Sequence, residues 1–514
     1  MNYKTAHQNK IVLVYPLATN YFQGLPYSLL FLERTLRDES LDVVIFDQKT
    51  IEEDEIIKYV TENQETILLV GFSVMLSVQL IYAHKIAEYI KKNYNIPTVF
   101  GGWFPTSYPE ICIDESFVDF IILGPGEKPF SELVKKIQQH ENDFEKINAL
   151  GYKKNDNIHI NKNIHWGNNF AYPQLDFSKI NIQNYIERNG KTLQYIATRG
   201  CNCKCNFCSL SSAKGFYHET NSVEHVISDL TYFKKLAPQI DQIKFNDDNF
   251  FTNKDFVLRL SEELIKNELN ITWLASAHIK QFLLLYSEEE LRIIKQSGCV
   301  LIYFGAESGD NNVLQNINKN YKVTDIIKVT SLLKKHNIQT SYSFMIGFPP
   351  DPDKDTKKTL LLFMKLYRIN HNLHTTINIY MPLNNNIYMD EAIKLGFKIP
   401  ESYSEFENFV KNGANLPWIK DDIINILNYF GNFYFPVFKR EYPVNINDKM
   451  KKTWRIFFII FYPFVKIRFL LNIMQFPFDA VIGLKILSSI EKKKNITSER
   501  DLNNFMIGIK RNEK

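Results

Sequence analysis

The stretch Cys201-Asn202-Cys203-Lys204-Cys205-Asn206-Phe207-Cys208 holds four of the six cysteines of this 514-residue chain. Three of them, Cys201, Cys205 and Cys208, form a C-x3-C-x2-C pattern. Soft thiolate ligands select zinc or iron–sulfur clusters. Three cysteines on one loop leave one iron of a four-iron cluster without a protein ligand. The pattern therefore indicates an iron–sulfur site with one iron open to a substrate or cofactor.

A structural zinc site, a disulfide framework and chance account less well for these cysteines. Structural zinc usually takes four ligands in two short pairs, and no second Cys/His pair stands elsewhere at such spacing. Outside the loop only Cys112 and Cys299 remain, too few for the disulfide framework of a small secreted domain. Chance clustering is very improbable. Cys203 lies outside the pattern, and we expect a spare thiol there, with a role as a substitute ligand left open.

The cysteine loop follows the first of six predicted strands. We predict strands over 193–197, 242–245, 271–276, 300–304, 340–346 and 375–380, and helices over 223–236, 255–269, 288–297 and 323–336. Six such units predict a partial (β/α)6 barrel, whose functional residues lie at the C-terminal ends of the strands.

With Phe207 directly before its last cysteine, the loop resembles that of the radical S-adenosylmethionine (SAM) superfamily. The resemblance implies that Cys201, Cys205 and Cys208 hold a [4Fe-4S] cluster, that the open iron chelates SAM, and that Phe207 packs near the adenine. It also implies reductive cleavage of SAM to a 5′-deoxyadenosyl radical. A reducing, cytoplasmic location suits such an oxygen-sensitive cluster.

Three further predicted strand ends resemble elements of the same superfamily: Asn246-Asp247-Asp248-Asn249-Phe250, Gly305-Ala306-Glu307-Ser308-Gly309 and Gly347-Phe348-Pro349-Pro350-Asp351. The resemblance implies that Glu307 and Ser308 contact SAM and that Asp247 or Asp248 lies near its methionyl or ribose end. The alternative for Glu307 is a carboxylate that accepts backbone N–H groups at a helix N-terminus. Two positions depart from the family: Asp351 replaces the usual glutamate, and Asn384-Asn385-Asn386 stands where relatives often have P-G-T.

The first part of the chain alternates predicted strands with predicted helices. Strands are expected over 11–15, 43–46, 67–72, 98–100 and 120–123, and helices over 27–37 and 79–92. This pattern predicts a doubly wound, Rossmann-like α/β domain, in which ligands bind beyond the carboxyl ends of the strands. Those ends carry the turns Gly71-Phe72-Ser73, Gly101-Gly102-Trp103-Phe104 and Gly124-Pro125-Gly126-Glu127.

In order and spacing, these turns resemble the cobalamin-binding domain that precedes many radical SAM cores. The resemblance implies a cobalamin site that contains Ser73, Gly101, Gly102, Gly124 and Glu127. No D-x-H-x-x-G motif occurs, so we expect cobalamin without a histidine ligand. Glycine also serves tight turns for steric reasons alone, and Trp103-Phe104 departs from the family pattern. A domain that has lost the cofactor therefore stays an alternative.

Length and composition predict two or three globular domains. Hydrophobic residues make up 45% of the chain and aromatic residues 14%, enough to bury large cores. We expect a cobalamin-binding-like α/β domain over 1–145, a hairpin and linker over 146–190, a radical SAM core over 191–400 and a mainly helical region over 401–514. The N-terminal segment shows no cleavable small-residue site, so its apolar run is interpreted as a strand and not a signal peptide.

The C-terminal region concentrates positive charge. Residues 449–494 contain ten basic and two acidic residues, whereas the whole chain carries a net charge of only +4. The charge-free stretches are well short of the roughly 20 residues of a spanning helix, so a transmembrane span is not expected. Basic residues interleaved with aromatic ones suit a peripheral, interfacial helix on anionic lipid. The alternative is a helical cap over the barrel mouth, broken at Pro463 and Pro477. No nucleic acid is expected, because no RNA-binding module is visible.

Together the resemblances imply a cobalamin-dependent radical SAM enzyme that methylates an unactivated carbon of a small or lipid-like substrate and receives electrons from an external donor. Cobalamin and cluster would open onto one cavity. Two rivals remain: a radical SAM cyclase or rearrangement enzyme without methyl transfer, and a non-catalytic iron–sulfur or cobalamin-binding regulator. No proton donor or acceptor is predicted, because Tyr303, His278 and Tyr342 suit packing as well as catalysis.

Overall fold

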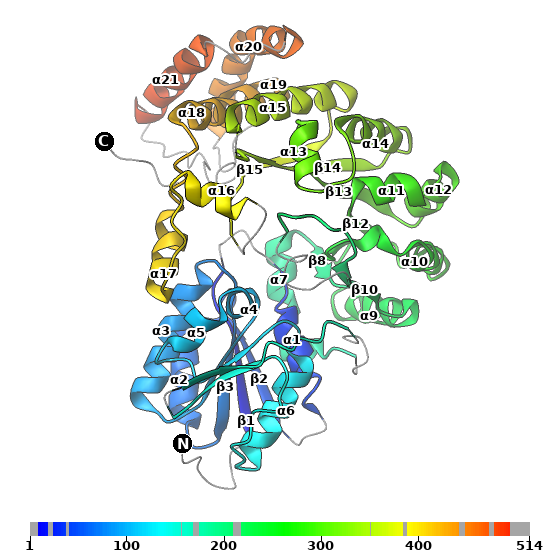
Figure 1. Ribbon diagram of the computed structural model, residues 1–514. Coiled ribbons are helices and arrows are strands. Elements are labelled where there is room, and N and C mark those ends of the chain that lie inside the picture. The colour runs from blue at the N-terminus through cyan, green and yellow to red at the C-terminus, as the bar shows by residue number, and fades with distance from the viewer. Residues whose placement is uncertain are drawn as a thin grey trace.

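A computed structural model shows two large, mainly parallel sheets, one in the N-terminal part and one in the middle of the chain, with the last helices at the far end of the molecule (Figure 1). The structure describes residues 9–18, 24–37, 41–155, 157–167, 174–208, 217–349, 351–383, 388–440, 448–471 and 477–493.

The N-terminal sheet has seven strands, in the order β2-β1-β3-β4-β5-β6-β7. The first five pair in parallel, and β6 and β7 add an antiparallel edge. The strands are β1 (Lys10–Tyr15), β2 (Asp42–Asp47), β3 (Ile67–Ser73), β4 (Thr98–Gly101), β5 (Phe120–Ile122), β6 (Leu150–Lys154) and β7 (Asn157–Ile160). The helices are α1 (Tyr27–Glu33), α2 (Glu53–Asn63), α3 (Gln79–Asn93), α4 (Trp103–Ser107), α5 (Pro109–Asp114) and α6 (Glu127–Gln138).

Both faces of the parallel part of this sheet are buried, as the doubly wound pattern predicts. Along β1, Leu13 belongs to a core shared with α1 and α6, whereas Val12 and Val14 belong to a second core shared with α2 and α3. Successive side chains of a strand point to opposite faces, so a strand covered on both sides must be apolar throughout. The predicted hairpin after residue 146 is present and extends this sheet by pairing β6 with β5.

The second sheet contains the six predicted strands, all parallel, in the order β15-β14-β13-β12-β11-β8. The order follows the chain, so the sheet curls into a half-barrel that stays open between β8 and β15, and the predicted partial barrel is confirmed. The strands are β8 (Thr192–Tyr195), β11 (Gln242–Phe245), β12 (Thr272–Ala277), β13 (Cys299–Glu307), β14 (Gln339–Ile346) and β15 (His374–Ile379). The helices are α9 (Val223–Leu236), η3 (Phe250–Thr252), α10 (Lys254–Lys266), α11 (Ile279–Leu285), α12 (Glu288–Gln296), α13 (Asn311–Asn316), α14 (Val323–Lys335) and α15 (Pro352–Ile369).

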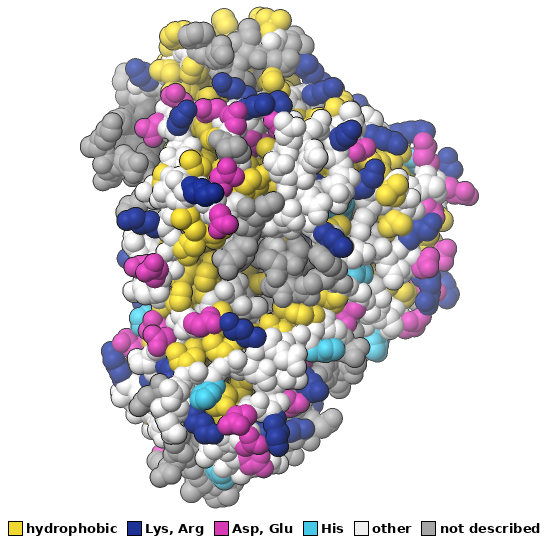
Figure 2. Space-filling view, in the orientation of Figure 1, with side chains coloured by type: hydrophobic (Ala, Val, Ile, Leu, Met, Phe, Trp, Pro, Cys, Tyr) yellow, Lys and Arg dark blue, Asp and Glu magenta, His cyan; other side chains and the backbone are white. Residues whose placement is uncertain are grey.

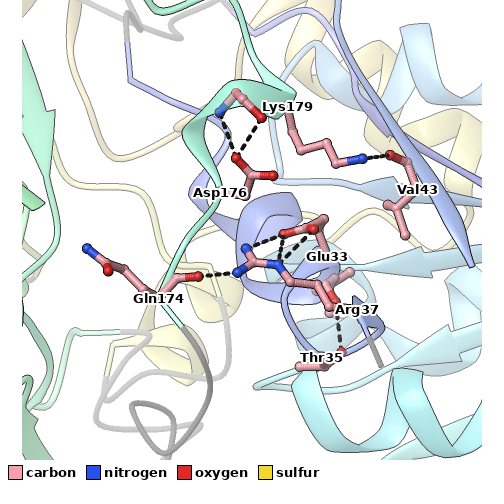
Figure 3. A network of polar contacts seen from close by, with 9 residues as sticks. Glu33, Thr35, Arg37, Val43, Gln174, Asp176 and Lys179 are labelled. Carbon is pink, nitrogen blue, oxygen red and sulfur yellow. Dashed lines mark hydrogen bonds and ion pairs between the residues drawn. The ribbon is translucent and has the colours of Figure 1, made fainter. Parts of the chain in front are cut away.

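The segment between the two sheets, with η2 (Phe177–Lys179) and α7 (Ile182–Asn189), is bonded to the N-terminal unit (Figure 3). Arg37, ion-paired with Glu33 at 2.7 Å, donates to the backbone carbonyl of Gln174. The Lys179 ammonium donates to the carbonyl of Val43 in β2 at 3.2 Å. One hydrophobic core also runs through both units. These contacts fix the orientation of the two sheets.

The C-terminal region packs on both units. It contains α16 (Met389–Lys394), α17 (Tyr403–Asn412), α18 (Asp421–Tyr429), the π-helical turn η4 (Phe430–Tyr434), α19 (Phe435–Lys439), α20 (Asp448–Leu471) and α21 (Phe478–Lys493). Helix α17 returns to the N-terminal unit, where the Tyr403 hydroxyl donates to the carbonyl of Leu80 at 3.0 Å.

The predicted break at Pro463 is wrong, because α20 runs through that residue. A proline inside a helix leaves the carbonyl four residues earlier without its donor. Here that carbonyl belongs to Ile459, and both residues lie on the exposed face of α20, where the carbonyl can be solvated. Pro477 directly precedes the first residue of α21, a position that proline tolerates.

Candidate functional site

The cysteine loop leaves the half-barrel beside its first strand. It begins at the end of β9 (Thr198–Cys201), which pairs with β10 (Tyr217–Thr220) in a short hairpin directly after β8. Cys205 is buried, whereas Cys201, Cys203 and Cys208 are half-buried. The Asn249 side-chain amide donates to the sulfur of Cys201 at 3.6 Å, and the Cys203 backbone N–H donates to the same sulfur at 3.5 Å. N–H donors toward a cysteine sulfur stabilise its thiolate form, the form that ligates metal.

The three patterned cysteines therefore share one loop at a strand end, as predicted. In the part of the chain that the structure describes, no three metal-ligating side chains converge on the point that a single ion would occupy. A four-iron cluster does not require the cysteines to converge on one point, because each cysteine ligates a different iron. The donor set of three thiolates fits such a cluster.

Asp247 and Asp248 brace the strand that leads into the loop. The Asp247 carboxylate accepts the backbone N–H of Thr198, and Asp248 accepts that of Gly200 at 2.9 Å. Asp247 is buried, and its desolvation raises the pKa of the carboxyl to about 7. Asp248 is exposed and lines the large cavity described below. Both predicted SAM residues thus lie next to the loop and position it.

Glu307 and Phe207 meet through Lys319, a residue that the sequence did not single out. The Lys319 ammonium lies 2.9 Å from the Glu307 carboxylate and 5.3 Å from the centre of the Phe207 ring. Both charged side chains are buried. Burial alone would lower the pKa of Lys319, but the Glu307 carboxylate and nearby acidic groups raise it well above its usual value. A buried lysine between two predicted SAM contacts carries no recognisable motif, so only the fold reveals it.

The geometry also accounts for the glycine two residues before Glu307. Glu307 has a φ of 58°, in the left-handed region, and the pairing of β13 with β14 shifts register between Gly305 and Glu307. A Cβ atom at Gly305 would lie 2.2 Å from the Glu307 carboxylate oxygen and 3.2 Å from the Lys319 ammonium. The glycine therefore makes room for the ion pair, which differs from the helix N-terminal role considered for Glu307.

Ser308 points away from this cluster. Its hydroxyl is buried and donates to the carboxylate of Asp355, which also accepts the Gly347 N–H at 3.0 Å. Burial raises the pKa of Asp355 to about 6. Asp351, the predicted departure, is exposed and caps α15 by accepting the Lys354 N–H at 3.1 Å. The other departure, Asn384-Asn385-Asn386, lies outside the described residues.

A cavity of about 610 Å³ separates the carboxyl edge of the N-terminal sheet from the half-barrel. It is lined by all five predicted cobalamin residues, Ser73, Gly101, Gly102, Gly124 and Glu127, together with Trp103. Its opposite wall comes from the barrel side and includes Gln194, Arg199, Lys244, Asn246 and Asp248. The cavity thus reaches from the glycine turns to the strand that carries the first cysteine.

The glycine turns fit a bulky ligand held at backbone level. Gly101 lines the cavity, and a Cβ atom there would touch nothing closer than 4.0 Å, so any side chain would take up cavity space. Gly102 has a φ of 99°, and a Cβ there would lie 2.7 Å from the Val74 carbonyl oxygen, so only glycine suits this turn. The residues present therefore fit a cobalamin, because glycines without side chains leave room for it beside the backbone.

Glu127 joins the cavity to the cysteine loop. Its carboxylate lies at the start of α6 and forms an ion pair with Arg199 at 2.6 Å and a longer one with Arg34 at 3.8 Å. Arg199 stands two residues before Cys201, and its guanidinium lies 3.6 Å from the centre of the Phe31 ring. A predicted cobalamin residue thus holds the strand that enters the predicted cluster site.

Two more barrel residues were left without a role by the sequence. Lys244 on β11 lines the cavity, lies 5.5 Å from the Tyr303 ring centre, and has no carboxylate of the described chain within ion-pair distance. Its burial lowers the pKa of the ammonium.

His278 follows β12, and its ring packs edge-on against Tyr321 with 5.5 Å between the ring centres. Desolvation lowers the pKa of the imidazole to about 3, so the ring is neutral.

Comparison with known proteins agrees with this arrangement. The chain matches the Radical SAM superfamily over residues 195–363 and the B12 binding domain over residues 16–134. An uncharacterised methyltransferase of Pyrococcus horikoshii is 28% identical over 373 residues, covering 70% of this chain and 78% of that protein. The anaerobic magnesium-protoporphyrin IX monomethyl ester cyclase of Synechocystis is 24% identical over 343 residues, covering 64% of this chain and 66% of the cyclase.

Two solved structures share the fold. The cobalamin-dependent S-adenosylmethionine radical enzyme OxsB, with aqua-cobalamin and S-adenosylmethionine bound, has a TM-score of 0.71 at 17% identity, covering 97% of this chain and 76% of OxsB. The radical S-adenosylmethionine methyltransferase TsrM of Kitasatospora setae has a TM-score of 0.64 at 17% identity, covering 78% of this chain and 83% of TsrM.

Residues 195–363 form a radical SAM domain, whose half-barrel presents three cysteines on the loop that follows its first strand and the short strand β9. Residues 16–134 form a B12-binding domain, which precedes the radical SAM domain in the chain. The cofactors that these two domains imply are a [4Fe-4S] cluster, SAM and cobalamin.

Proposed function

We propose that this protein is a cobalamin-dependent radical SAM enzyme that methylates an unactivated carbon of a small or lipid-like substrate. The supporting observation is the shared cavity, which one wall of glycine turns and one wall of barrel residues line together. When bound, the cluster and SAM would supply hydrogen abstraction, and cobalamin would supply the methyl group. The enzyme would act in the cytoplasm and take electrons from an external donor.

In this proposal each part of the chain has a separate task. Residues 1–145 would present cobalamin on Ser73, Gly101, Gly102, Gly124 and Glu127. Residues 146–190 would tie that domain to the core over 191–400, in which Cys201, Cys205 and Cys208 hold the cluster. Phe207 and Glu307, which lie on either side of Lys319, would contact SAM. Ser308 would hold the end of β13 through its hydrogen bond to Asp355. Asp247 and Asp248 would hold the loop in place at the barrel mouth.

Lys244 suggests one chemical feature of the substrate. A cation that is largely buried without a carboxylate partner is costly unless a ligand supplies the anion. Lys244 faces the cavity in which the proposed substrate would lie between the two cofactors. We therefore propose an acidic group on the substrate, and a substrate search would begin with hydrophobic metabolites that carry a carboxylate or phosphate.

The proposal is tested by anaerobic reconstitution with iron, sulfide and hydroxocobalamin, followed by SAM and dithionite. We expect retained cobalamin by absorbance, and 5′-deoxyadenosine together with S-adenosylhomocysteine by mass spectrometry. With substrate, two SAM molecules per methylated product would support methyl transfer. Well-loaded cluster and cobalamin without 5′-deoxyadenosine would contradict the proposal and favour a regulator.

A cyclase is the second candidate, because a relative that matches over 343 residues is named as a cyclase. It would consume SAM without transferring a methyl group. Deuterated methyl-SAM separates the two functions, since only a methyltransferase carries the label into the product.

A further inference from the structure

The two last helices present large apolar side chains to the outside. On α20 these are Ile456, Ile459, Ile460, Phe464, Ile467 and Leu471, and on α21 they are Phe478, Ile482 and Ile486. We call these nine side chains the outer stripe. Ile459, at 75% exposed, is the extreme case. Figure 2 shows hydrophobic side chains gathered at the end of the molecule where Figure 1 places α20 and α21.

Helix α20 is apolar on both of its faces. Its inner face buries Trp454, Phe457, Phe458, Phe461 and Val465, and Phe433 of η4 packs against Phe457 and Phe461. That inner face meets the need of an ordinary amphipathic helix to cover a core. The inner face of α20 packs on η4 and α19, and the outer stripe is additional to that packing. Exposed apolar patches of this extent on a monomer mark an interaction surface.

The charge around the outer stripe selects the kind of partner. Lys452, Arg455 and Lys466 of α20 and Lys485 of α21 are exposed. Among the described side chains of the two helices, Asp479 is the sole carboxylate, and it forms an ion pair with Arg468 at 2.8 Å. An apolar stripe flanked by cations, with its one described acid neutralised, complements an anionic lipid surface. Apolar side chains enter the acyl boundary while lysine and arginine meet the headgroups.

On such a surface the two helices would lie in the plane of the interface and would not cross it. Among the described residues, no helix combines the length and apolar character that a membrane crossing needs. Helix α20 is about 36 Å long at 1.5 Å per residue, and its inner face belongs to the protein core from Trp454 to Val465. An orientation in the interface plane, with only the outer stripe inserted, fits both observations.

We propose that α20 and α21 dock this protein on the surface of an anionic membrane through the outer stripe and its flanking lysines. The proposal does not depend on the reaction catalysed, since the stripe lies outside the cavity between the two sheets. A membrane-docked enzyme would meet a hydrophobic substrate at the interface.

The test is flotation of the full-length, reconstituted protein with vesicles. Vesicles of equal parts phosphatidylglycerol and phosphatidylcholine should bind about a hundredfold more tightly than phosphatidylcholine alone, because each cation near an anionic surface adds about fivefold in affinity. The variant Ile459→Ser/Phe464→Ser should lose at least about tenfold in affinity for the anionic vesicles. Lys452→Glu/Lys466→Glu should lose a similar factor and most of the salt dependence.

Matched controls lie far from the outer stripe. Leu284→Ser on α11 removes an isolated apolar side chain that is 71% exposed, and Lys328→Glu on α14 reverses an exposed charge; neither should change vesicle binding. All variants should retain reductive SAM cleavage, which separates a failed docking surface from a failed enzyme. Absence of vesicle binding overturns the proposal. So does a dimer in light scattering that Ile459→Ser/Phe464→Ser converts to monomer, because a second copy would then cover the stripe.

Discussion

The cysteine loop and the interdomain cavity are two sites made in opposite ways. In the loop, function depends on the identity of three side chains within eight residues, and almost any fold that leaves them exposed to iron would serve. In the cavity, the predicted cobalamin residues are mostly glycines, and the binding surface consists of turns from separate strand ends that only the sheet brings together. A site that depends on a few specific side chains close together in the chain can therefore be identified from the sequence. A site formed by the backbone of distant turns can be identified only from the structure.

The sharpest way to test this comparison is to remove one ligand. Cys205→Ala should reduce cluster iron and bring 5′-deoxyadenosine to background, because the alanine leaves a second iron without a ligand. Cys203→Ala is the matched control in the same loop, and it should keep both iron content and SAM cleavage. Iron analysis and mass spectrometry of the two purified variants check the prediction. Equal loss in both would show that the C-x3-C-x2-C pattern has been assigned wrongly.

The corresponding change in the cavity adds volume instead of removing a ligand. Gly101→Phe should weaken cobalamin binding by up to about a hundredfold, since overpacking costs roughly 1–3 kcal/mol. The φ of Gly101 is not in the left-handed region, and an added Cβ meets nothing closer than 4.0 Å, so the variant should fold. Gly101→Ala should have little effect. Absorbance titration with hydroxocobalamin measures the affinity, and unchanged cluster iron confirms that the two sites fail separately.

Sequence reasoning recovered the elements that have a strong local signal. The six barrel strands, five parallel N-terminal strands and the hairpin follow from apolar runs and turn residues. Helix α2 was missed because its apolar residues are confined to the short run 56–60 between charged and polar residues. Lys319 and Lys244 could not be found, since a lone lysine has no pattern until the fold buries it. The break expected at Pro463 was wrong because local propensity yields to the packing of the inner face of α20.

The ion pair between Glu127 and Arg199 connects the two sites, so it tests how independent they are. Arg199→Met should lower the free energy of unfolding by about 2 kcal/mol, because a buried carboxylate loses its nearest partner. The Glu127→Gln/Arg199→Met double variant should recover part of that loss. Lys58→Met is the control, since its pair with Glu62 is exposed. Urea denaturation measures the stabilities of the wild type, the two single variants Glu127→Gln and Arg199→Met, the double variant and the control. Additive losses in the double variant would mean that the two residues act separately.

A further expected effect is on the pH dependence of stability, through Asp247, whose carboxylate accepts a backbone N–H of the strand before the cysteine loop. The pKa of Asp247 is raised to about 7 in the folded chain by burial, against about 3.9 in an unfolded chain. Between about pH 4 and 7 the native state therefore holds a proton that the unfolded state has released, and its stability falls as pH rises through that window.

Asp247→Asn keeps an oxygen to accept the Thr198 N–H but cannot ionise. We expect the variant to match the wild type near pH 4 and to exceed its free energy of unfolding by up to about 4 kcal/mol above pH 7, at about 1.4 kcal/mol per pKa unit. Urea titrations at pH 4.5 and 8 would contradict this if the difference between the two proteins did not change with pH. A constant difference would mean that Asp247 is ionised throughout, and that the loop is braced by a charge and not by a neutral hydrogen bond.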